Sequence, residues 1–195
     1  MRKSIKRIFS TVLSDEVVVE FLFRMYTHDI NSFRHMLHTC CYAAAIAEQC
    51  YEYNDTLQIA KGAALHDIGK LLIPGRILNK PGDLNEDELA MVRGHPQSGY
   101  ELIKERINDS VIYDIIKHHH ERTSGTGYPD KLYGNEISAQ VSIVITADVF
   151  DAMTCERAYH RALSPEEAFS VMRNELGGAY IDILEDCIKK EGQPG

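Results

Sequence analysis

Apolar residues recur at helical spacing along nearly the whole of this 195-residue chain, and this periodicity constrains the fold more than any other feature. The segment 31–54 contains the alanine-rich stretch CCYAAAIAEQC, which is typical of a helix. Asn85 with Glu88, and Ser164 with Glu167, carry the signal of a helix N-terminus. No hairpin pattern accompanies these signals. The sequence therefore predicts an all-α fold.

One segment, QVSIVITADVF at 140–150, is rich in β-branched residues and on composition alone favours a strand. It continues into DAMTCERA without a turn signal, and apolar residues at 141, 144, 145, 149 and 152 keep helical spacing. We therefore predict a buried helix here. Loop signals are clear in two other segments, PGRILNKPGD at 74–83 and TSGTGYPDKLYG at 123–134.

The length suits one domain with a hydrophobic core, and 44% apolar with 26% charged residues is typical of a globular chain. We expect residues 1–30 to form an N-terminal helical preface and residues 31–190 to form the main domain. Nothing in the sequence indicates an oligomeric state.

The net charge of −8 excludes some classes of function. No basic stripe follows the first residues, MRKSIKRIF, so binding of polymeric nucleic acid is disfavoured, whereas a small anionic substrate stays open. No run of about 18 apolar residues is present, which argues against a membrane span. No apolar region or cleavage site follows the basic start, so the expected location is the cytoplasm.

The five cysteines are odd in number and form no CxxC pair: Cys40, Cys41, Cys50, Cys155 and Cys187. This pattern argues against disulfides and against a thiolate zinc site. We interpret them as buried thiols.

The dipeptide His66-Asp67 lies near the end of an apolar helical segment. Adjacent side chains on a helix diverge by about 100°, so both reach one ion only if that ion lies near the helix end. Alone, the pair is common: His66 then serves as a core or capping histidine, and Asp67 caps a turn.

Other candidate ligands change this interpretation. Asp148 stands within the apolar run IVITADVF, where a buried carboxylate needs a cation, a hydrogen-bond network or a metal. Imidazoles and carboxylates without thiolates are the ligands expected for iron, manganese or zinc. The remaining candidates are His35, His95, His119 and His120.

The order of these residues resembles the HD phosphohydrolase superfamily, and more specifically its HD-GYP branch, the cyclic di-GMP phosphodiesterases. Three segments carry the resemblance: HDIGKLLIPGRILNKPGDLNEDELAMVRGHPQSGYELI, HHERTSGTGYP and ADVFDAMTCERAYHRALSPEEAF. Together they cover roughly residues 29 to 175. The tripeptide GYP alone would be weak evidence, but the joint match is specific.

The resemblance implies an all-α HD-domain bundle with a central site for two divalent metal ions, iron or manganese, and a cyclic dinucleotide substrate. Asp67 matches the carboxylate that bridges the two ions, and Lys70 matches a catalytic lysine beside the scissile phosphate. The matching metal ligands are His35, His66, Asp67, His95, His119, His120 and Asp148. The matching substrate-binding positions are Gly127, Tyr128, Pro129, Arg157 and His160.

Within the run HHHE at 118–121, the same resemblance implies different roles for neighbouring residues. Glu121 is expected to orient one of the two ligands before it, whereas His118 matches no family role and is expected to be structural or exposed. Gly125 and Gly127 are expected to permit the turn that sets Tyr128 over the site.

Three positions depart from the family pattern. Asn31 stands where some members have a glutamate that helps to hold a third metal, which argues against a third ion. Ser124 replaces the aspartate of HHExxDGxGYP, and the family's RPYK is Arg157-Ala158-Tyr159-His160 here. A lysine that binds phosphate thus becomes a titratable histidine.

Three alternatives to a cyclic-dinucleotide phosphodiesterase remain open. The first is a metal-containing module that binds the nucleotide and signals by protein contact, which the altered RPYK and DG positions would suit. The second is a phosphohydrolase acting on another nucleotide. The third is a metal-free helical domain, in which seven aligned ligand-type residues would be a coincidence.

Overall fold

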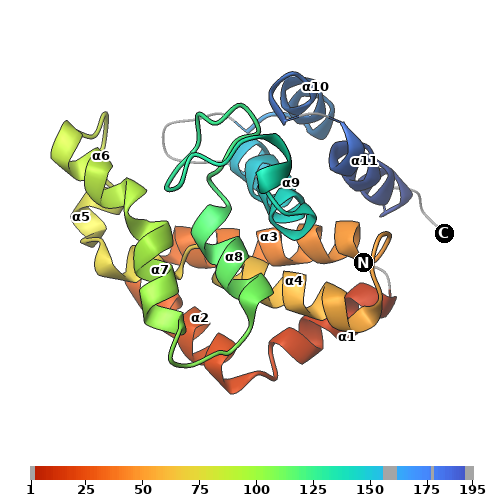
Figure 1. Ribbon diagram of the computed structural model, residues 1–195, viewed down its shortest axis with the longest axis horizontal. Helices are drawn as coiled ribbons and strands as arrows, with labels where there is room; N and C mark the ends of the chain where they lie inside the picture. Colours follow the sequence, from red (N-terminus) through yellow and green to blue (C-terminus); the bar gives the residue numbers. More distant parts are fainter. Residues whose placement is uncertain (1–2, 156–161, 177, 192–195) are drawn as a thin grey trace.

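The computed structural model describes residues 3–155, 162–176 and 178–191. Within these ranges the regular elements are helices, and the one pairing of sheet type is an isolated bridge between Ser124 and Tyr133. The prediction of an all-α fold is confirmed (Figure 1). The elements are α1 (Lys3–Val12), α2 (Glu16–His28), α3 (Ile30–Ala47), α4 (Tyr53–Leu65), η1 (Ile68–Leu72), α5 (Gly75–Leu78), α6 (Glu86–Arg93), α7 (His95–Ile103), α8 (Ser110–His118), η2 (Gly134–Glu136), α9 (Ala139–Thr154), α10 (Pro165–Leu176) and α11 (Ala179–Glu191).

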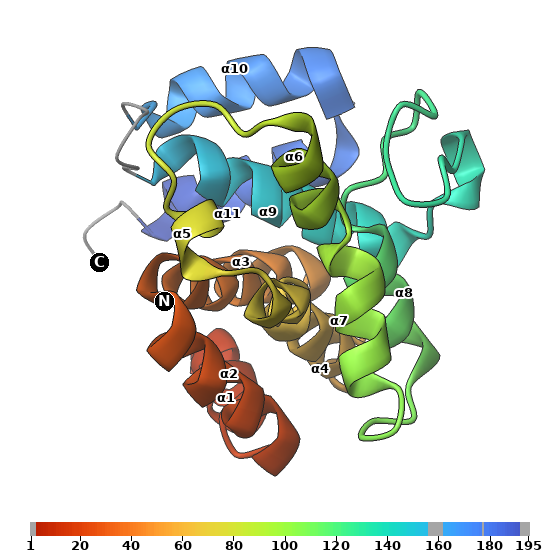
Figure 2. The same cartoon turned by 90° about the vertical axis from the view of Figure 1, so that its left-hand side faces the viewer.

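The centre of the molecule is built by α3, which packs along both α4 and α9, while α8 packs against α4. Their contacts are made by fully buried apolar side chains, among them Met36, Leu65, Ile115 and Val144. Helices α1 and α2 cover one side of this core and α10 lies on the opposite side, beyond α9 (Figure 2). The core is continuous with the first two helices, since Val12 and Met25 belong to the same buried cluster.

The β-branched segment forms α9, as predicted, because nearly every side chain from Val141 to Ala147 is buried. Burial against α3 and α10 outweighs the modest strand preference of these residues. The hydroxyl of Ser138 caps the first turn by accepting from the Val141 N–H.

Both predicted caps are also present. Asn85 and Glu88 form a reciprocal capping box at α6, and Ser164 and Glu167 do the same at α10. The segment predicted as a loop at 74–83 contains the single helical turn α5, so that prediction was only partly right. No helix within the described residues is long and apolar enough to cross a membrane.

Candidate metal centre

Helix ends place most of the candidate ligands. His66 is the C-cap residue of α4, and Asp67, directly after it, is the N-cap residue of η1. His95 opens α7 where α6 has just ended, and His119 is the C-cap residue of α8. The geometric condition for an HD pair, an ion near the end of the helix, is therefore met. His35 and Asp148 come instead from the middle of α3 and α9.

The packing of η1 on α7 brings two of these ends together through Gly69. A Cβ added at Gly69 would meet the His95 carbonyl oxygen at 1.9 Å, which no real structure tolerates. Glycine is therefore needed after the HD pair so that Asp67 and His95 can approach each other.

The candidate ligands gather into two groups, and within each group the ligand atoms lie within 4.8 Å of one another. We call them by their first histidine. The His35 group contains His35, His66 and Asp148, and the His95 group contains Asp67, His95, His119 and His120.

Asp67 lies between the two groups and presents one oxygen to each. Its Oδ1 is 3.1 Å from His95 Nε2 and 3.8 Å from His119 Nε2. Its Oδ2 is 3.4 Å from His66 Nε2 and 3.8 Å from His35 Nε2. A carboxylate placed in this way can bridge two ions.

Three of the imidazoles are fixed by backbone carbonyls in the turn before them. Nδ1 of His66 donates to the Ala63 oxygen at 2.7 Å, and Nδ1 of His95 donates to the Val92 oxygen at 2.7 Å. Nδ1 of His119 donates to the Ile116 oxygen at 2.9 Å. Because a carbonyl can only accept, each Nδ1 carries a proton, so in the neutral form of each ring the lone pair is on Nε2, which faces the centre.

Among the described residues, no hydrogen-bond donor faces these lone pairs. His95 Nε2 and His119 Nε2 lie 3.1 Å apart, and Asp67 Oδ1 lies beside them, so acceptors face acceptors. His66 Nε2 and Asp67 Oδ1 are buried atoms without a hydrogen-bond partner. Buried polar atoms in this state are strongly unfavourable, and a cation among them would satisfy all of them at once. The donor set fits a divalent metal ion.

Burial keeps two imidazoles of the His95 group, those of His119 and His120, neutral. Desolvation, with the neighbouring imidazoles, holds the pKa of His119 well below its usual range. Desolvation lowers the pKa of His120 to about 3, although Asp148 opposes this shift. Neutral imidazole is the form that binds a metal.

His35 is held differently, because its Nδ1 donates to a carboxylate. Asp151 Oδ2 accepts this hydrogen bond at 2.6 Å, and Nε2 lies 2.8 Å from Asp148 Oδ1. Burial lowers the pKa of His35, but the hydrogen bonds with Asp148 and Asp151 raise it to about 9. An ion bound by Nε2 would replace the proton between His35 and Asp148.

Asp151 was not among the predicted residues, although a signal for it was present. It follows Asp148 by three positions on the same apolar helix, so both carboxylates share a face of α9. Asp151 is 1% exposed, and a buried carboxylate of this kind needs partners. It orients His35, whereas an orienting carboxylate, Glu121, was expected only for His119 or His120.

Glu121 has a different role from the one predicted. Its side chain is fully buried, and its oxygens accept from the backbone N–H groups of Asp130, Lys131 and Leu132. Three such bonds offset the burial of the charge and hold the loop that contains GYP. This role of Glu121 could not be predicted from the sequence, because its partners are backbone groups nine to eleven positions away.

The loop 123–134 places Tyr128 against the centre. Its ring stacks on that of His120, with centroids 4.8 Å apart and planes at 22°. Gly125 has φ +72°, and a Cβ at Gly127 would lie 2.4 Å from the Glu121 Cα, so both glycines are required by the backbone. Pro129 follows Tyr128.

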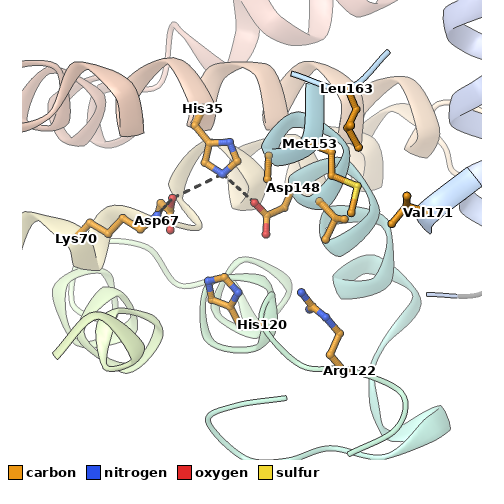
Figure 3. A pocket seen from close by; sticks show the side chains of 11 residues that line it. His35, Asp67, Lys70, His120, Arg122, Asp148, Met153, Leu163 and Val171 are labelled. Atoms are coloured by element: carbon orange, nitrogen blue, oxygen red, sulfur yellow. Dashed lines mark hydrogen bonds and ion pairs between the residues drawn. The ribbon is translucent and has the colours of Figure 1, made fainter. Parts of the chain in front are cut away.

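The centre opens into a cavity of about 390 Å³. Lys70 and Arg122 line it with positive charge, and Figure 3 shows the Arg122 side chain pointing toward the space between His120 and Asp148. Lys70 Nζ donates to Asp67 Oδ2 at 2.6 Å. Arg122 was not predicted from the sequence. The apolar part of the wall is formed by Val149, Ala152, Met153, Leu163 and Val171.

Other predicted positions lie elsewhere. Arg157 and His160 fall outside the described residues. Asn31 is exposed on α3. His118 points away from the centre and pairs with Asp114 at 2.6 Å and Asp130 at 3.0 Å, so the expectation that it is structural is confirmed.

Helices α3, α4, α8 and α9 around a cluster of imidazoles and carboxylates define a helical domain with a centre suited to metal ions. The HD domain family matches residues 21–183, and the chain belongs to this family. The resemblance to its HD-GYP branch is confirmed by relatives in sequence, and one solved structure shares the fold.

The cyclic di-GMP phosphodiesterase PA4108 of Pseudomonas aeruginosa is 37% identical over 96% of this chain and 46% of its own length. The 3'3'-cGAMP-specific phosphodiesterase 3 of Vibrio cholerae is 35% identical over 70% of this chain and 30% of its own. The structure of Bd1817, an HDG"Y"P protein from Bdellovibrio bacteriovorus, shares the fold with a TM-score of 0.66 at 23% identity, over 80% of this chain and 51% of that one. The chain thus spans less than half the length of these two curated relatives.

Proposed function

We propose that this domain is a metal-dependent phosphodiesterase that hydrolyses cyclic di-GMP, or a related 3′,5′-cyclic dinucleotide, to the linear dinucleotide. The observation that carries the proposal is the placement of Asp67, with one oxygen toward each group of ligands at the floor of a cavity lined by Lys70 and Arg122. The names of the relatives support the substrate class.

Two ions, iron or manganese, would be held in this centre with Asp67 as the bridge. The His35 group would bind one ion through His35, His66 and Asp148, and the His95 group would bind the other. Divalent ions held in this way supply an activated water and neutralise charge on the phosphate. A third ion is not expected, because an amide at Asn31 is a much poorer partner than a carboxylate.

The chain's own residues would bind and orient the phosphodiester. Lys70 stands next to Asp67, so its ammonium adds fixed positive charge where a phosphate oxygen becomes more negative. Arg122 brings a second cation from the other side of the cavity, and its planar fork suits a phosphate. By the motif, Arg157 and His160 would add further phosphate contacts.

The GYP loop and the apolar wall would hold the nucleoside part. Tyr128, whose ring stacks on His120, would contact the substrate together with Gly127 and Pro129, and Met153 with the other apolar residues lines the cavity. Burial raises the pKa of Tyr128, which keeps its hydroxyl a hydrogen-bond donor near neutral pH. The cavity thus combines cations for phosphates with apolar surface for a base or ribose.

The proposal is tested by purifying the protein anaerobically, measuring metal per chain, and following turnover of cyclic di-GMP, 3′3′-cGAMP and cyclic di-AMP with product identification. We expect two metals and hydrolysis of at least one cyclic dinucleotide. Tight binding without turnover in fully loaded protein would favour the signalling module. Turnover of other nucleotides alone would favour a different phosphohydrolase.

Arg122 gives a sharper test of substrate contact. Arg122→Gln should raise KM at least tenfold and leave the metal content unchanged, because the guanidinium faces the cavity without being a ligand. The matched control is Arg76→Gln, since Arg76 is an exposed arginine that does not line the cavity. Equal kinetics in the two variants would remove Arg122 from the substrate site.

A further inference from the structure

A third cluster of ligand-type side chains lies beside the metal centre on the outer side of α3 and α9. It consists of His38, Asp151 and Cys155, whose ligand atoms lie within 4.8 Å of one another. His38 comes from α3, one turn after His35, and Cys155 is the residue at which α9 ends. Sequence spacing gives no sign of the cluster, because His38 is 113 and 117 positions from its two partners.

Asp151 is the centre of this cluster. Its Oδ1 accepts from His38 Nδ1 at 2.9 Å and from the Cys155 thiol at 3.1 Å, and His38 Nδ1 is 3.5 Å from Cys155 Sγ. In a tetrahedral zinc site the corresponding N···O, O···S and N···S separations are roughly 3.3, 3.5 and 3.6 Å. Movements of a few tenths of an ångström would thus convert the hydrogen-bonded triangle into three ligands.

Access and rigidity both suit an ion from solvent. Half of the His38 side chain is exposed, whereas Asp151 is 1% exposed and is held from behind by His35. The Asp151 carboxylate is thus held in place, and the His38 imidazole lies on the solvent-exposed side of the cluster. A water can complete the coordination on the exposed side, as in zinc sites with three protein ligands.

We propose that His38 Nδ1, Asp151 Oδ1 and Cys155 Sγ form a second metal site, distinct from the two ligand groups of the centre, for a thiophilic divalent cation of the zinc type. Binding releases the thiol proton of Cys155 to solvent, and the proton that His38 Nδ1 donates to Asp151 moves through solvent to Nε2, which frees the Nδ1 lone pair for the metal. The thiolate separates this site chemically from the centre, whose imidazoles and carboxylates also accept harder ions.

The site is joined to the metal centre by one carboxylate. Asp151 Oδ2 accepts the hydrogen bond from His35 Nδ1, so an ion on Oδ1 would draw electron density from that bond. His35 Nε2 would then be a weaker donor to the catalytic metal. Occupation should lower hydrolysis severalfold. This consequence, unlike the site itself, rests on the proposed function.

Cobalt(II) reports the site directly, because a thiolate ligand gives Co²⁺ an intense near-ultraviolet charge-transfer band that nitrogen and oxygen ligands do not. Titration of the purified chain should produce this band with a stoichiometry of about one per chain. Cys155→Ser should abolish the band, and His38→Gln should weaken cobalt binding at least tenfold. The control Cys50→Ser should keep the band, since Cys50 is an exposed thiol outside the cluster.

Absence of the band in the wild type, or its persistence in Cys155→Ser, would overturn the proposal. Helicity and thermal unfolding of each variant are measured so that loss of folding is not mistaken for loss of a ligand. The coupling is tested separately in manganese-loaded protein, where one equivalent of zinc should inhibit the wild type and spare Cys155→Ser. Equal inhibition would overturn the coupling. A protein without hydrolysis would refute the proposed function, while the cobalt band would still decide the site.

Discussion

The two groups of the metal centre differ in how one imidazole is held, although His66 of the His35 group is also fixed by a backbone carbonyl. In the His95 group, His95 and His119 are each fixed through Nδ1 by a backbone carbonyl of the preceding turn. In the His35 group, His35 is fixed by the carboxylate of Asp151. The first arrangement follows from helical geometry, whereas the second depends on a side chain.

This difference decides in which group the ligand strength of an imidazole can be changed. A backbone carbonyl cannot be replaced by substitution, so the basicity of His95 and His119 is set by the fold. A carboxylate partner makes an imidazole a stronger ligand and can itself be substituted, protonated or bound by another ion. The His35 group is thus the part of the centre open to adjustment.

The largest effect is expected where the two groups share a residue. Asp67→Asn removes the charge that faces both groups and leaves one amide oxygen for two ions. We expect the metal content to fall below one ion per chain and hydrolysis to fall below detection. Elemental analysis and a turnover assay measure both quantities. Two tightly bound metals with normal turnover would mean that Asp67 is not the bridge.

A second test separates the two groups physically. Gly69→Ala puts a methyl group into the His95 carbonyl oxygen, so η1 must move away from α7 and carry Asp67 with it. We expect a loss of about 2–3 kcal/mol in the free energy of unfolding, or roughly 5–10 °C in Tm, with weaker metal retention. Gly75→Ala is the control, because nothing lies within 4 Å of a Cβ there. Equal unfolding temperatures would show that the approach is not tight.

Much of this architecture is readable in the sequence, and the reasons differ by element. The caps at Asn85 and Ser164 were predicted because both partners lie within four residues. The helical period of α9 was visible despite its β-branched residues. The division of the ligands into two groups cannot be predicted from any spacing along the chain.

What escaped prediction depends on contacts between distant parts of the chain. Glu121 binds backbone N–H groups of the loop, and no residue type marks such partners. Arg122 lines the cavity directly after the fully buried Glu121, and only the fold determines this placement. Asp151 could have been found from its helical spacing to Asp148, but its partner His35 lies 116 positions away.

Asp151→Asn tests whether the two groups bind their ions independently. The amide oxygen can still accept from His35 Nδ1, but without charge, so we expect metal affinity in the His35 group to fall about 10–100-fold while the His95 group keeps its ion. Measured metal content should approach one per chain at limiting metal. The matched control is Asp114→Asn, which alters the same kind of carboxylate–imidazole contact at His118. Loss of metal from both groups in Asp151→Asn would show that the two are not independent.

The smallest effect is expected at His118, the first of three consecutive histidines. It ends α8 and turns toward Asp114 and Asp130, whereas His119 and His120 turn toward the centre. The two aspartates are more than a third exposed, so each ion pair contributes up to about 1 kcal/mol. His118→Gln should therefore lower the free energy of unfolding by about 1 kcal/mol and leave metal content and turnover unchanged.

His119→Gln provides the opposing result, because this neighbour should lose metal from the His95 group. Chemical denaturation measures the stability of both variants, and elemental analysis measures their metals. The pair distinguishes membership of the centre from adjacency in sequence: one residue step rotates a side chain by about 100° on a helix, which is enough to move an imidazole from a buried cluster to an aspartate pair. Loss of metal in His118→Gln would show that the centre extends beyond the two groups. Helical geometry alone would then not decide which histidines belong to the His95 group.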